Sequence, residues 1–361
     1  MEDKLVLLNP GPVNLTSRVR SALTKPDLCH REPEFSRLQS NIRSAILGVY
    51  KLSKKDYGSV LLTGSGTLAV ESMITSLVPP NGKLLVVENG VYGERIKRIA
   101  QTHGIEHVAV AHQWGEELDV ARIEAQLADD GAISHVAAVH HETTTGRLNN
   151  LAVVGVLCRR HKKALLIDAV SSFGSEDIRF DEWGITACAA SANKCLHGAP
   201  GVSFVVGRRT SFAGLKAENP RSVYLDLSGY WQEQERGLSP FTHAVHIFYA
   251  LNEALEELEE VGGQVARKEH YQGLASLIRD RAHDAGLSRH LASGMLACSL
   301  TAFQLPPNTL YRQLHDPLRE AGFVIYAGQG DLSKTMFRIA HMGNVTEDDI
   351  ERLFVHLGSI V

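Results

Sequence analysis

Residues 163–201 read KALLIDAVSSFGSEDIRFDEWGITACAASANKCLHGAPG and decide the fold. The apolar run 164–167 ends in Asp168, which is typical of a buried parallel strand that brings a carboxylate to the ligand-binding edge of an α/β sheet. A second run of small residues, 186–192, leads to Lys194 in a turn rich in glycine and proline. The pattern therefore predicts a carboxylate and a lysine at the ends of neighbouring strands.

A carboxylate and a lysine in this arrangement suit pyridoxal phosphate. The aldehyde of this cofactor forms a Schiff base with an amine, and its ring nitrogen needs an anion to stay protonated. Lys194 must lose its proton to act as a nucleophile or base, and burial and nearby cations favour that loss by lowering the pKa. A surface lysine and a capping aspartate would give the same sequence pattern, so other segments must decide whether this is a cofactor site.

Composition indicates a globular protein of two domains. The 361 residues are long enough for a large core, and they include 44% hydrophobic and 22% charged residues. A formal charge of -4 gives no electrostatic reason to expect nucleic acid as a partner. Five cysteines without a signal-like N-terminus predict reduced thiols and a cytoplasmic protein. No apolar run approaches the roughly 20 residues that span a membrane.

Strand and helix patterns alternate through the first 206 residues, which predicts an α/β domain with a mainly parallel sheet. We expect an N-terminal arm over residues 1–15 and a cofactor-binding major domain over 16–244. The segment 213–240 shows no clean period and is predicted to be irregular. A strongly periodic helix then opens a smaller C-terminal domain, so that the linking helix and this domain cover residues 245–361.

A glycine turn follows the predicted strand 60–63. The residues after Gly64 are Ser65, Gly66 and Thr67, and a helix is predicted directly behind them. Free N–H groups at a helix N-terminus bind phosphate, and the two hydroxyls add donors. The same turn also fits a dinucleotide fingerprint, with Glu88 as the acidic residue about 20 residues further on. The turn alone favours neither ligand.

Two other segments place side chains beyond predicted strand ends. Tyr92 could cover one face of a flat ring, although an aromatic residue there is often packing alone. Residues 140–146, HHETTTG, are dense in hydrogen-bonding groups that could meet a hydroxylated ring. The adjacent His140, His141 and Glu142 suggest a metal. We expect none, because neighbours on a strand point to opposite faces and no second ligand cluster has usable spacing.

Arg338 lies in the alternating stretch 336–340, MFRIA, on the face opposite Phe337 and Ile339. An arginine on a strand is often only an edge charge. If Arg338 instead faces the major domain, its planar guanidinium makes a bidentate clamp for a carboxylate or phosphonate.

Together these segments resemble the class V aminotransferases of PLP fold type I. The resemblance covers nearly the whole chain and is carried by Asn9-Pro-Gly-Pro12, Ser65-Gly-Thr67, His140-x-Glu-Thr-Thr-Thr-Gly146, Asp168, Ser191-Ala-Asn-Lys194-Cys and Phe337-Arg338. It implies a mainly parallel seven-stranded sheet in the major domain and a smaller α+β C-terminal domain. Within the family the resemblance is greatest to members that transfer the amino group of 2-aminoethylphosphonate to pyruvate by ping-pong chemistry.

The resemblance also implies a role for each site residue. Lys194 would carry pyridoxal phosphate as a Schiff base, and Asp168 would pair with its ring nitrogen. The other implied contacts are Ser65, Gly66 and Thr67 at the phosphate, Tyr92 on the ring, Thr143 near the phenolic oxygen, Ser191 in the cofactor site, Thr242 at the phosphate of the partner subunit in a homodimer, and Pro10, Gly11 and Arg338 at the substrate.

Three alternatives remain open at this stage. Residues 29–35, CHREPEF, lack an acidic stretch found in many family members and are closer to alanine:glyoxylate-type relatives, which favours alanine or serine as the amino donor. A nicotinamide-dependent oxidoreductase would use Gly64-x-Gly66 and Glu88, but it gives Asp168 and Lys194 no shared purpose. A catalytically silent binding protein would not need the lysine.

Overall fold

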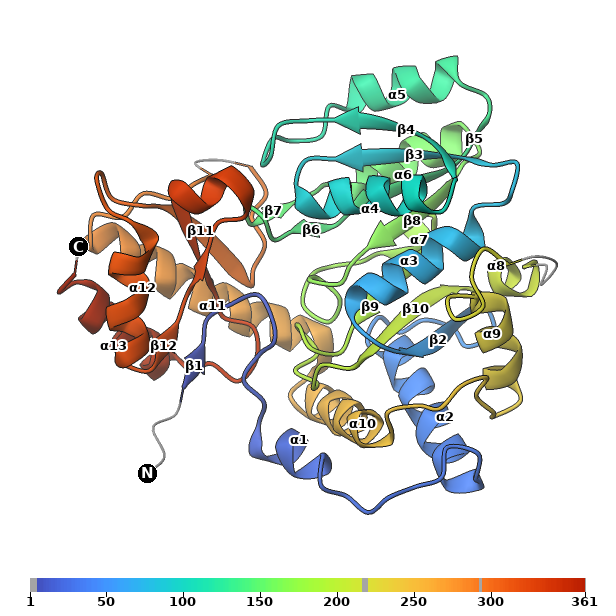
Figure 1. Cartoon of the computed structure of the whole chain (residues 1–361), viewed down its shortest axis with the longest axis horizontal. Coiled ribbons are helices and arrows are strands. Elements are labelled where there is room, and N and C mark those ends of the chain that lie inside the picture. The colour runs from blue at the N-terminus through green and yellow to red at the C-terminus, as the bar shows by residue number, and fades with distance from the viewer. Residues whose placement is uncertain (1–4, 216–219, 292–293, 361) are drawn as a thin grey trace.

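The computed structural model describes residues 5–215, 220–291 and 294–360, which form a large lobe and a smaller lobe (Figure 1). The large lobe is built on one seven-stranded sheet in the order β2-β10-β9-β8-β5-β3-β4. Its strands are β2 (Tyr57–Thr63), β3 (Lys83–Glu88), β4 (Glu106–Ala111), β5 (Ile133–Val139), β8 (Ala164–Asp168), β9 (Ile185–Ser191) and β10 (Val202–Arg208). All neighbours are parallel except β10, which runs antiparallel to β2 and β9. The predicted mainly parallel sheet of seven strands is confirmed.

Helices cover both faces of this sheet because its strands are apolar on both sides. In β3, Leu84 and Val86 face one core, whereas Leu85 and Val87 face the other. The helices of the large lobe are α1 (Ser17–Ala22), α2 (Pro33–Gly48), α3 (Gly66–Leu77), α4 (Val91–Thr102), α5 (Val120–Asp129), α6 (Leu151–Arg160), α7 (Phe180–Trp183), α8 (Arg209–Ala213), α9 (Leu227–Glu235) and α10 (Val245–Glu260). Because β3, β4, β5, β8 and β9 run parallel to one another, their C-terminal ends lie at one shared edge of the sheet.

The segment predicted to be irregular contains helix α9, so that prediction was wrong for residues 227–235. Asp226 starts the helix, because its carboxylate accepts hydrogen bonds from Ser228 N at 3.0 Å and Gly229 N at 3.1 Å. The helix buries Tyr230 and Trp231 against the sheet core. Only 9 residues long, it shows too few periodic positions to stand out from its polar neighbours.

The smaller lobe combines a three-stranded sheet, β11-β14-β13, with helices around it. Its elements are α11 (Gly263–Asp284), β11 (Leu300–Gln304), α12 (Tyr311–Glu320), β12 (Phe323–Val324), β13 (Tyr326–Ala327), the 3-10 helix η1 (Gly330–Lys334), β14 (Met336–Ala340) and α13 (Glu347–Leu357). The extended segment 323–327 is divided between the two short strands β12 and β13. Its first half pairs with β1 (Val6–Leu7), and its second half pairs with β14.

The N-terminal strand β1 belongs to the smaller lobe, where Figure 1 shows it in dark blue beside the red β12. Leu8 continues the pairing, because its N–H donates to Val324 O at 2.8 Å and its carbonyl accepts from Ala340 N at 2.8 Å. The chain then crosses to the large lobe. The last short strands, β6 (His141–Glu142) and β7 (Arg147–Leu148), form a hairpin beyond β5. None of the helices in the described part of the chain is long and apolar enough to cross a membrane.

Candidate functional site

Lys194 lies three residues beyond the end of β9, at the edge where the parallel strands end. Its ammonium donates a hydrogen bond to Pro10 O. Gly11, at φ +108°, lies against the same side chain, and a Cβ there would be 2.9 Å from Lys194 Cδ and 3.0 Å from Nζ. Desolvation lowers the pKa of Lys194 to about 8, and the charges of Arg338 and Arg95 act in the same direction. The N-terminal turn thus covers a lysine whose amine loses its proton easily.

Asp168 is the last residue of β8, and β8 pairs directly with β9. Its side chain is buried, and Oδ1 accepts a hydrogen bond from Val170 N at 2.9 Å. Burial raises the pKa of Asp168 to about 6, against the lowering effect of that bond and of the charges on Arg95 and Lys194. The carboxylate and the lysine predicted at neighbouring strand ends therefore share one site.

The predicted phosphate loop lies beside these strand ends. Ser65 is the N-cap residue of α3 and its side chain makes no capping hydrogen bond, which leaves the N-terminus of this helix available to an anion. Gly66 packs so closely that a Cβ would be 2.6 Å from Val170 Cγ1 and 3.2 Å from Ser191 Cβ. Ser191 is itself buried. The close approach brings the start of α3 to the ends of β8 and β9.

Helix α4 presents Tyr92 and Arg95 near the same loop. The guanidinium carbon of Arg95 is 4.7 Å from the centre of the Tyr92 ring, and Nη1 donates to Thr67 Oγ1 at 3.1 Å. Arg95 was not among the residues proposed from the sequence. Its spacing from Tyr92, three residues on a helix, is the feature that could have revealed it.

The ETTT segment holds helix α4 in place. Glu142 is fully buried and its Oε2 accepts from Tyr92 N at 3.2 Å, while Thr144 Oγ1 accepts from Val91 N at 3.1 Å. These side chains satisfy N–H groups that the helix itself leaves free. Gly90 allows the approach, since a Cβ there would be 2.3 Å from Glu142 Cδ. Burial raises the pKa of Glu142 to about 7.

Thr143 lies between these two capping residues, but it contacts the smaller lobe and not the start of helix α4. Its hydroxyl is buried without a hydrogen-bond partner among the described residues, and its carbonyl accepts from Arg338 Nη1 at 2.8 Å. Arg338 is fully buried, and its Nε and Nη2 both donate to Ala327 O, at 3.0 and 2.6 Å. Arg338 thus reaches from the smaller lobe to the large lobe, as one of the two alternatives predicted.

His141 also borders the site. It belongs to the segment 140–146 that could meet a hydroxylated ring, and no metal role was expected for it. Its Nδ1 is 3.0 Å from Ser171 O. A carbonyl only accepts, so Nδ1 carries the proton and Nε2 is an acceptor. Nε2 is buried without a partner in the described part of the chain. Burial lowers the pKa of His141 to about 4, and the charge of Lys194 contributes. His141 is therefore a neutral acceptor.

A buried hydrogen-bond network joins the turn after Lys194 to the smaller lobe. The N–H of His197 donates to Lys194 O at 3.0 Å, and His197 has the left-handed φ of +65° that non-glycine residues rarely adopt. Its Nε2 is 2.5 Å from the hydroxyl of Tyr271 on α11, and Gly343 N lies 3.1 Å from Nε2. No pattern in the sequence indicated this connection.

Thr242 is exposed on the surface of the chain, and no hydrogen bond joins its side chain to the other site residues within the described part of the chain. Its neighbour His243 is buried, with Nδ1 2.9 Å from Thr63 Oγ1 at the end of β2. The segment 240–244 is thereby fixed beside the strand that leads into the phosphate loop.

The dinucleotide alternative finds no support in the geometry. Glu88, its ribose-binding candidate, is buried and its Oε1 is 2.7 Å from Lys97 Nζ, so its charge is already paired. Within the described residues, no three His, Cys, Asp or Glu side chains are grouped so that they could hold a metal ion.

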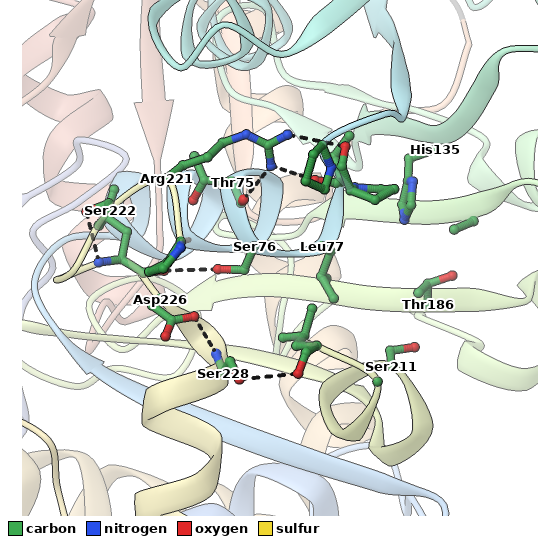
Figure 2. A pocket seen from close by; sticks show the side chains of 18 of the residues that line it. Thr75, Ser76, Leu77, His135, Thr186, Ser211, Arg221, Ser222, Asp226 and Ser228 are labelled. Atoms are coloured by element: carbon green, nitrogen blue, oxygen red, sulfur yellow. Dashed lines mark hydrogen bonds between the residues drawn. The ribbon is translucent and has the colours of Figure 1, made fainter. Parts of the chain in front are cut away.

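A second polar region is a cavity of about 690 Å³ at the opposite edge of the sheet. Thr186, near the start of β9, contributes to its lining. Arg221 donates there to Thr75 O at 2.8 Å and to Val78 O at 2.6 Å. Figure 2 shows these contacts beside Ser76 and Asp226. None of the predicted site residues lines this cavity.

The sequence model of the aminotransferase class-V family matches residues 20–352. The chain belongs to this family. It is 36% identical over 356 residues to the 2-aminoethylphosphonate–pyruvate transaminase of Bacillus cereus (strain AH820), covering 98% of this chain and 96% of that protein. The corresponding transaminase of Bacillus thuringiensis (strain Al Hakam) matches equally, at 36% identity over 356 residues, 98% of this chain and 96% of that protein.

Solved structures of aminotransferases have the same fold. Alanine–glyoxylate aminotransferase of Nostoc sp. superposes with a TM-score of 0.92 at 26% identity, over 99% of this chain and 95% of that one. Aspartate aminotransferase of Thermus thermophilus gives 0.89 at 25% identity, over 99% of this chain and 100% of that one. The predicted fold type I is therefore confirmed.

Class-V aminotransferases depend on pyridoxal phosphate, and the residues of this site fit that cofactor. The uncapped start of α3 suits its phosphate, and the buried Thr143 hydroxyl, without a partner among the described residues, suits a polar ring substituent. Asp168 offers a buried carboxylate and Lys194 an amine of lowered pKa. The residues at this sheet edge therefore fit the cofactor on which class-V aminotransferases depend.

Proposed function

We propose that this class-V aminotransferase transfers the amino group of 2-aminoethylphosphonate to pyruvate, giving phosphonoacetaldehyde and L-alanine. Full-length similarity to transaminases named for these two substrates supports the proposal. The geometric observation that carries it is Arg338, whose fully buried guanidinium joins the segment of Thr143 to the smaller lobe. Three of its N–H groups bond carbonyl oxygens, which leaves two for an anion.

The amino donor and the amino acceptor each present an anion to such a clamp, one a phosphonate and the other a carboxylate. A planar guanidinium bonds either group through paired N–H donors. Tyr326 lies beneath Arg338, with 5.4 Å between the guanidinium carbon and the ring centre, and fixes its plane. One clamp therefore serves two substrates that never occupy the site together.

Pyridoxal phosphate, when bound, would supply the carbonyl that accepts the amino group and the ring that withdraws electrons from the reacting carbon. Lys194 would hold the cofactor and move a proton through Nζ, because its lowered pKa lets the amine exist in both protonation states near neutral pH. Asp168 would keep the ring nitrogen protonated. Ser65, Gly66 and Thr67 would hold the phosphate and Tyr92 would cover the ring. Thr143 would lie near the phenolic oxygen, and Ser191 would belong to the cofactor site.

We also infer that the enzyme works as a homodimer in which Thr242 reaches the phosphate site of the partner subunit. Thr242 is exposed in the single chain, beside the segment that His243 fixes to Thr63. Val223 is 78% exposed and Tyr224 40% exposed, and the Tyr224 hydroxyl donates to Thr63 O at 3.2 Å. Apolar surface this close to the phosphate loop suits a second copy. An active monomer in light scattering would contradict the shared site.

Alanine or serine transamination with glyoxylate or pyruvate is the second candidate. The fold similarity to alanine–glyoxylate aminotransferase supports it, as does the CHREPEF segment at residues 29–35, in which Cys29 is exposed. Such an enzyme would need the Arg338 clamp only for carboxylates.

A half-reaction assay tests the choice. The loaded enzyme is mixed separately with 2-aminoethylphosphonate, alanine, serine and glycine, and the visible absorbance of the bound cofactor is followed. We expect 2-aminoethylphosphonate and alanine to remove this absorbance, since they are the amino donors of the forward and reverse reactions. Rapid loss with serine and none with the aminophosphonate would overturn the proposed substrate in favour of the second candidate.

A further inference from the structure

Arg95 differs from Glu94 and Lys97, two other charged residues of its helix. Lys97 is paired with Glu88 at 2.7 Å, and Glu94 accepts a hydrogen bond from Trp114 Nε1 at 2.7 Å. Arg95 is only partly exposed, and among the described residues no carboxylate lies close enough to form an ion pair with it. Its one hydrogen bond within this part of the chain is to Thr67 Oγ1. The guanidinium therefore keeps its charge and most of its donors free.

The position of this guanidinium is fixed from three directions. The Tyr92 ring lies 4.7 Å from its central carbon, and Thr67 Oγ1 holds Nη1 at 3.1 Å. Helix α4 is anchored behind it, because Glu142 and Thr144 cap its first turn. A side chain that merely screened charge would need no such support.

We propose that Arg95 is a phosphoryl-binding residue of the site, acting beside the start of α3. Thr67, which it contacts, lies in the first turn of α3, whose N-cap residue Ser65 makes no side-chain capping bond. A phosphoryl dianion placed there would meet the helix N–H groups and the guanidinium together. The influence of Arg95 on the pKa of both Lys194 and Asp168 agrees with a charge directed into the site.

Arg95 and Arg338 would then bind different anionic groups of the reactants. Arg338 bonds the carbonyl of Thr143 and belongs to the smaller lobe, whereas Arg95 bonds the phosphate loop and belongs to the large lobe. The dianion at Arg95 has two sources, the cofactor phosphate and a substrate phosphonate. Only the second source rests on the proposed function.

Affinity measurements on Arg95→Gln and Arg95→Lys separate these sources. The apoprotein is titrated with pyridoxal phosphate and with pyridoxal, which lacks the phosphate, and the loaded enzyme is titrated with 2-aminoethylphosphonate and with alanine. Arg98→Gln is the matched control, since Arg98 is exposed on the same helix. The lysine variant keeps the charge and guards against misfolding of the glutamine variant.

We expect Arg95→Gln to lose about 10- to 100-fold in affinity for one phosphoryl compound while its counterpart without that group is unchanged. A loss confined to pyridoxal phosphate assigns the cofactor phosphate, and a loss confined to the aminophosphonate assigns the substrate. Arg95→Lys should lose less, and Arg98→Gln nothing. Equal weakening of both members of each pair, or no weakening at all, would overturn the proposal. Failure of the wild-type enzyme to accept the aminophosphonate would overturn the proposed substrate and leave the pyridoxal comparison intact.

Discussion

The two edges of the large sheet both carry polar side chains but use them differently. At the edge opposite the lysine, the cavity of about 690 Å³ is large enough for a ligand, yet its polar groups bond one another. Arg221 satisfies backbone carbonyls at the end of α3, and Asp226 starts α9. At the lysine edge, Thr143 Oγ1 and His141 Nε2 are buried without partners in the described chain. Buried polar groups without partners, beside Lys194 and Asp168, distinguish the lysine edge from the cavity, whose volume alone indicates no ligand.

Electrostatics separates the edges in the same way. His135 lines the opposite cavity, and burial alone lowers its pKa to about 4. At the lysine edge, the charges of Lys194 and Asp168 act on each other's pKa, and Arg95 acts on both. Coupled charges of this kind are typical of catalytic sites, whereas a lone desolvated histidine is typical of a core.

The largest effect should come from Lys194→Ala. Loss of the amine removes both the cofactor attachment and the proton carrier, so turnover should fall by at least about 10³-fold. Transamination is measured by coupled assay, and circular dichroism checks that the fold is kept. Normal turnover in this variant would mean that the wrong edge has been assigned.

Arg338→Lys should reduce both half-reactions by about 10- to 100-fold, because lysine keeps the charge but loses the paired donors. The contacts to Ala327 and Thr143 would be lost as well, so Arg338→Ala should be worse. Stopped-flow absorbance with each amino donor measures the effect. A loss with the aminophosphonate alone, and none with alanine, would contradict a single shared clamp.

The pH dependence of cofactor uptake should report the pKa of Lys194. Only the unprotonated amine attacks the aldehyde, so the uptake rate of the apoprotein should rise with pH through a midpoint at about pH 8 and level off about one unit above it. A lysine at its ordinary pKa of 10.5 would still be gaining rate there. In Arg95→Gln the plateau should move to higher pH, since a charge that lowers the pKa is gone. An unchanged profile would show that Arg95 does not act on the lysine.

The smallest effect on catalysis should come from Arg221→Ala at the opposite edge. Carbonyl groups at the end of α3 lose their donors, so the free energy of unfolding should fall by about 1–3 kcal/mol. Turnover should stay within about twofold, as expected for a site with no part in catalysis. Chemical denaturation and steady-state kinetics measure the two quantities. A large loss of turnover with unchanged stability would give the opposite cavity a function.

The sequence predicted that Asp168 and Lys194 lie at the ends of neighbouring strands, because local patterns determine this arrangement. Apolar runs ending in Asp168 and leading to Lys194 specify buried strands, and parallel neighbours end at one edge. Glu142 and Thr144 were harder to interpret. They cap a helix that starts some 50 residues earlier in the chain, and only the fold brings the two segments together.

Other features depend on pairings that no local pattern encodes. Strand β1 joins β12, more than 300 residues away, through only two residue pairs. His197 contacts Tyr271 of α11 and Gly343 in the loop after β14, and its left-handed φ occurs without the glycine or asparagine that usually indicates this conformation. Such contacts follow from the packing of the lobes and become visible only in three dimensions.

The pairing of β1 has a mechanical consequence. Leu8 is hydrogen-bonded to Val324 and Ala340 of the smaller lobe, and two residues later Pro10 accepts the hydrogen bond of Lys194. The backbone of residues 8–10 therefore links β14, the strand of Arg338, to the amine of Lys194. A shift of β14 relative to the large lobe would pull on this backbone and so change the hydrogen bond that Pro10 O accepts from Lys194. Two glycines inserted after Leu8 would keep every residue of the site but would lengthen this backbone link between β14 and Lys194.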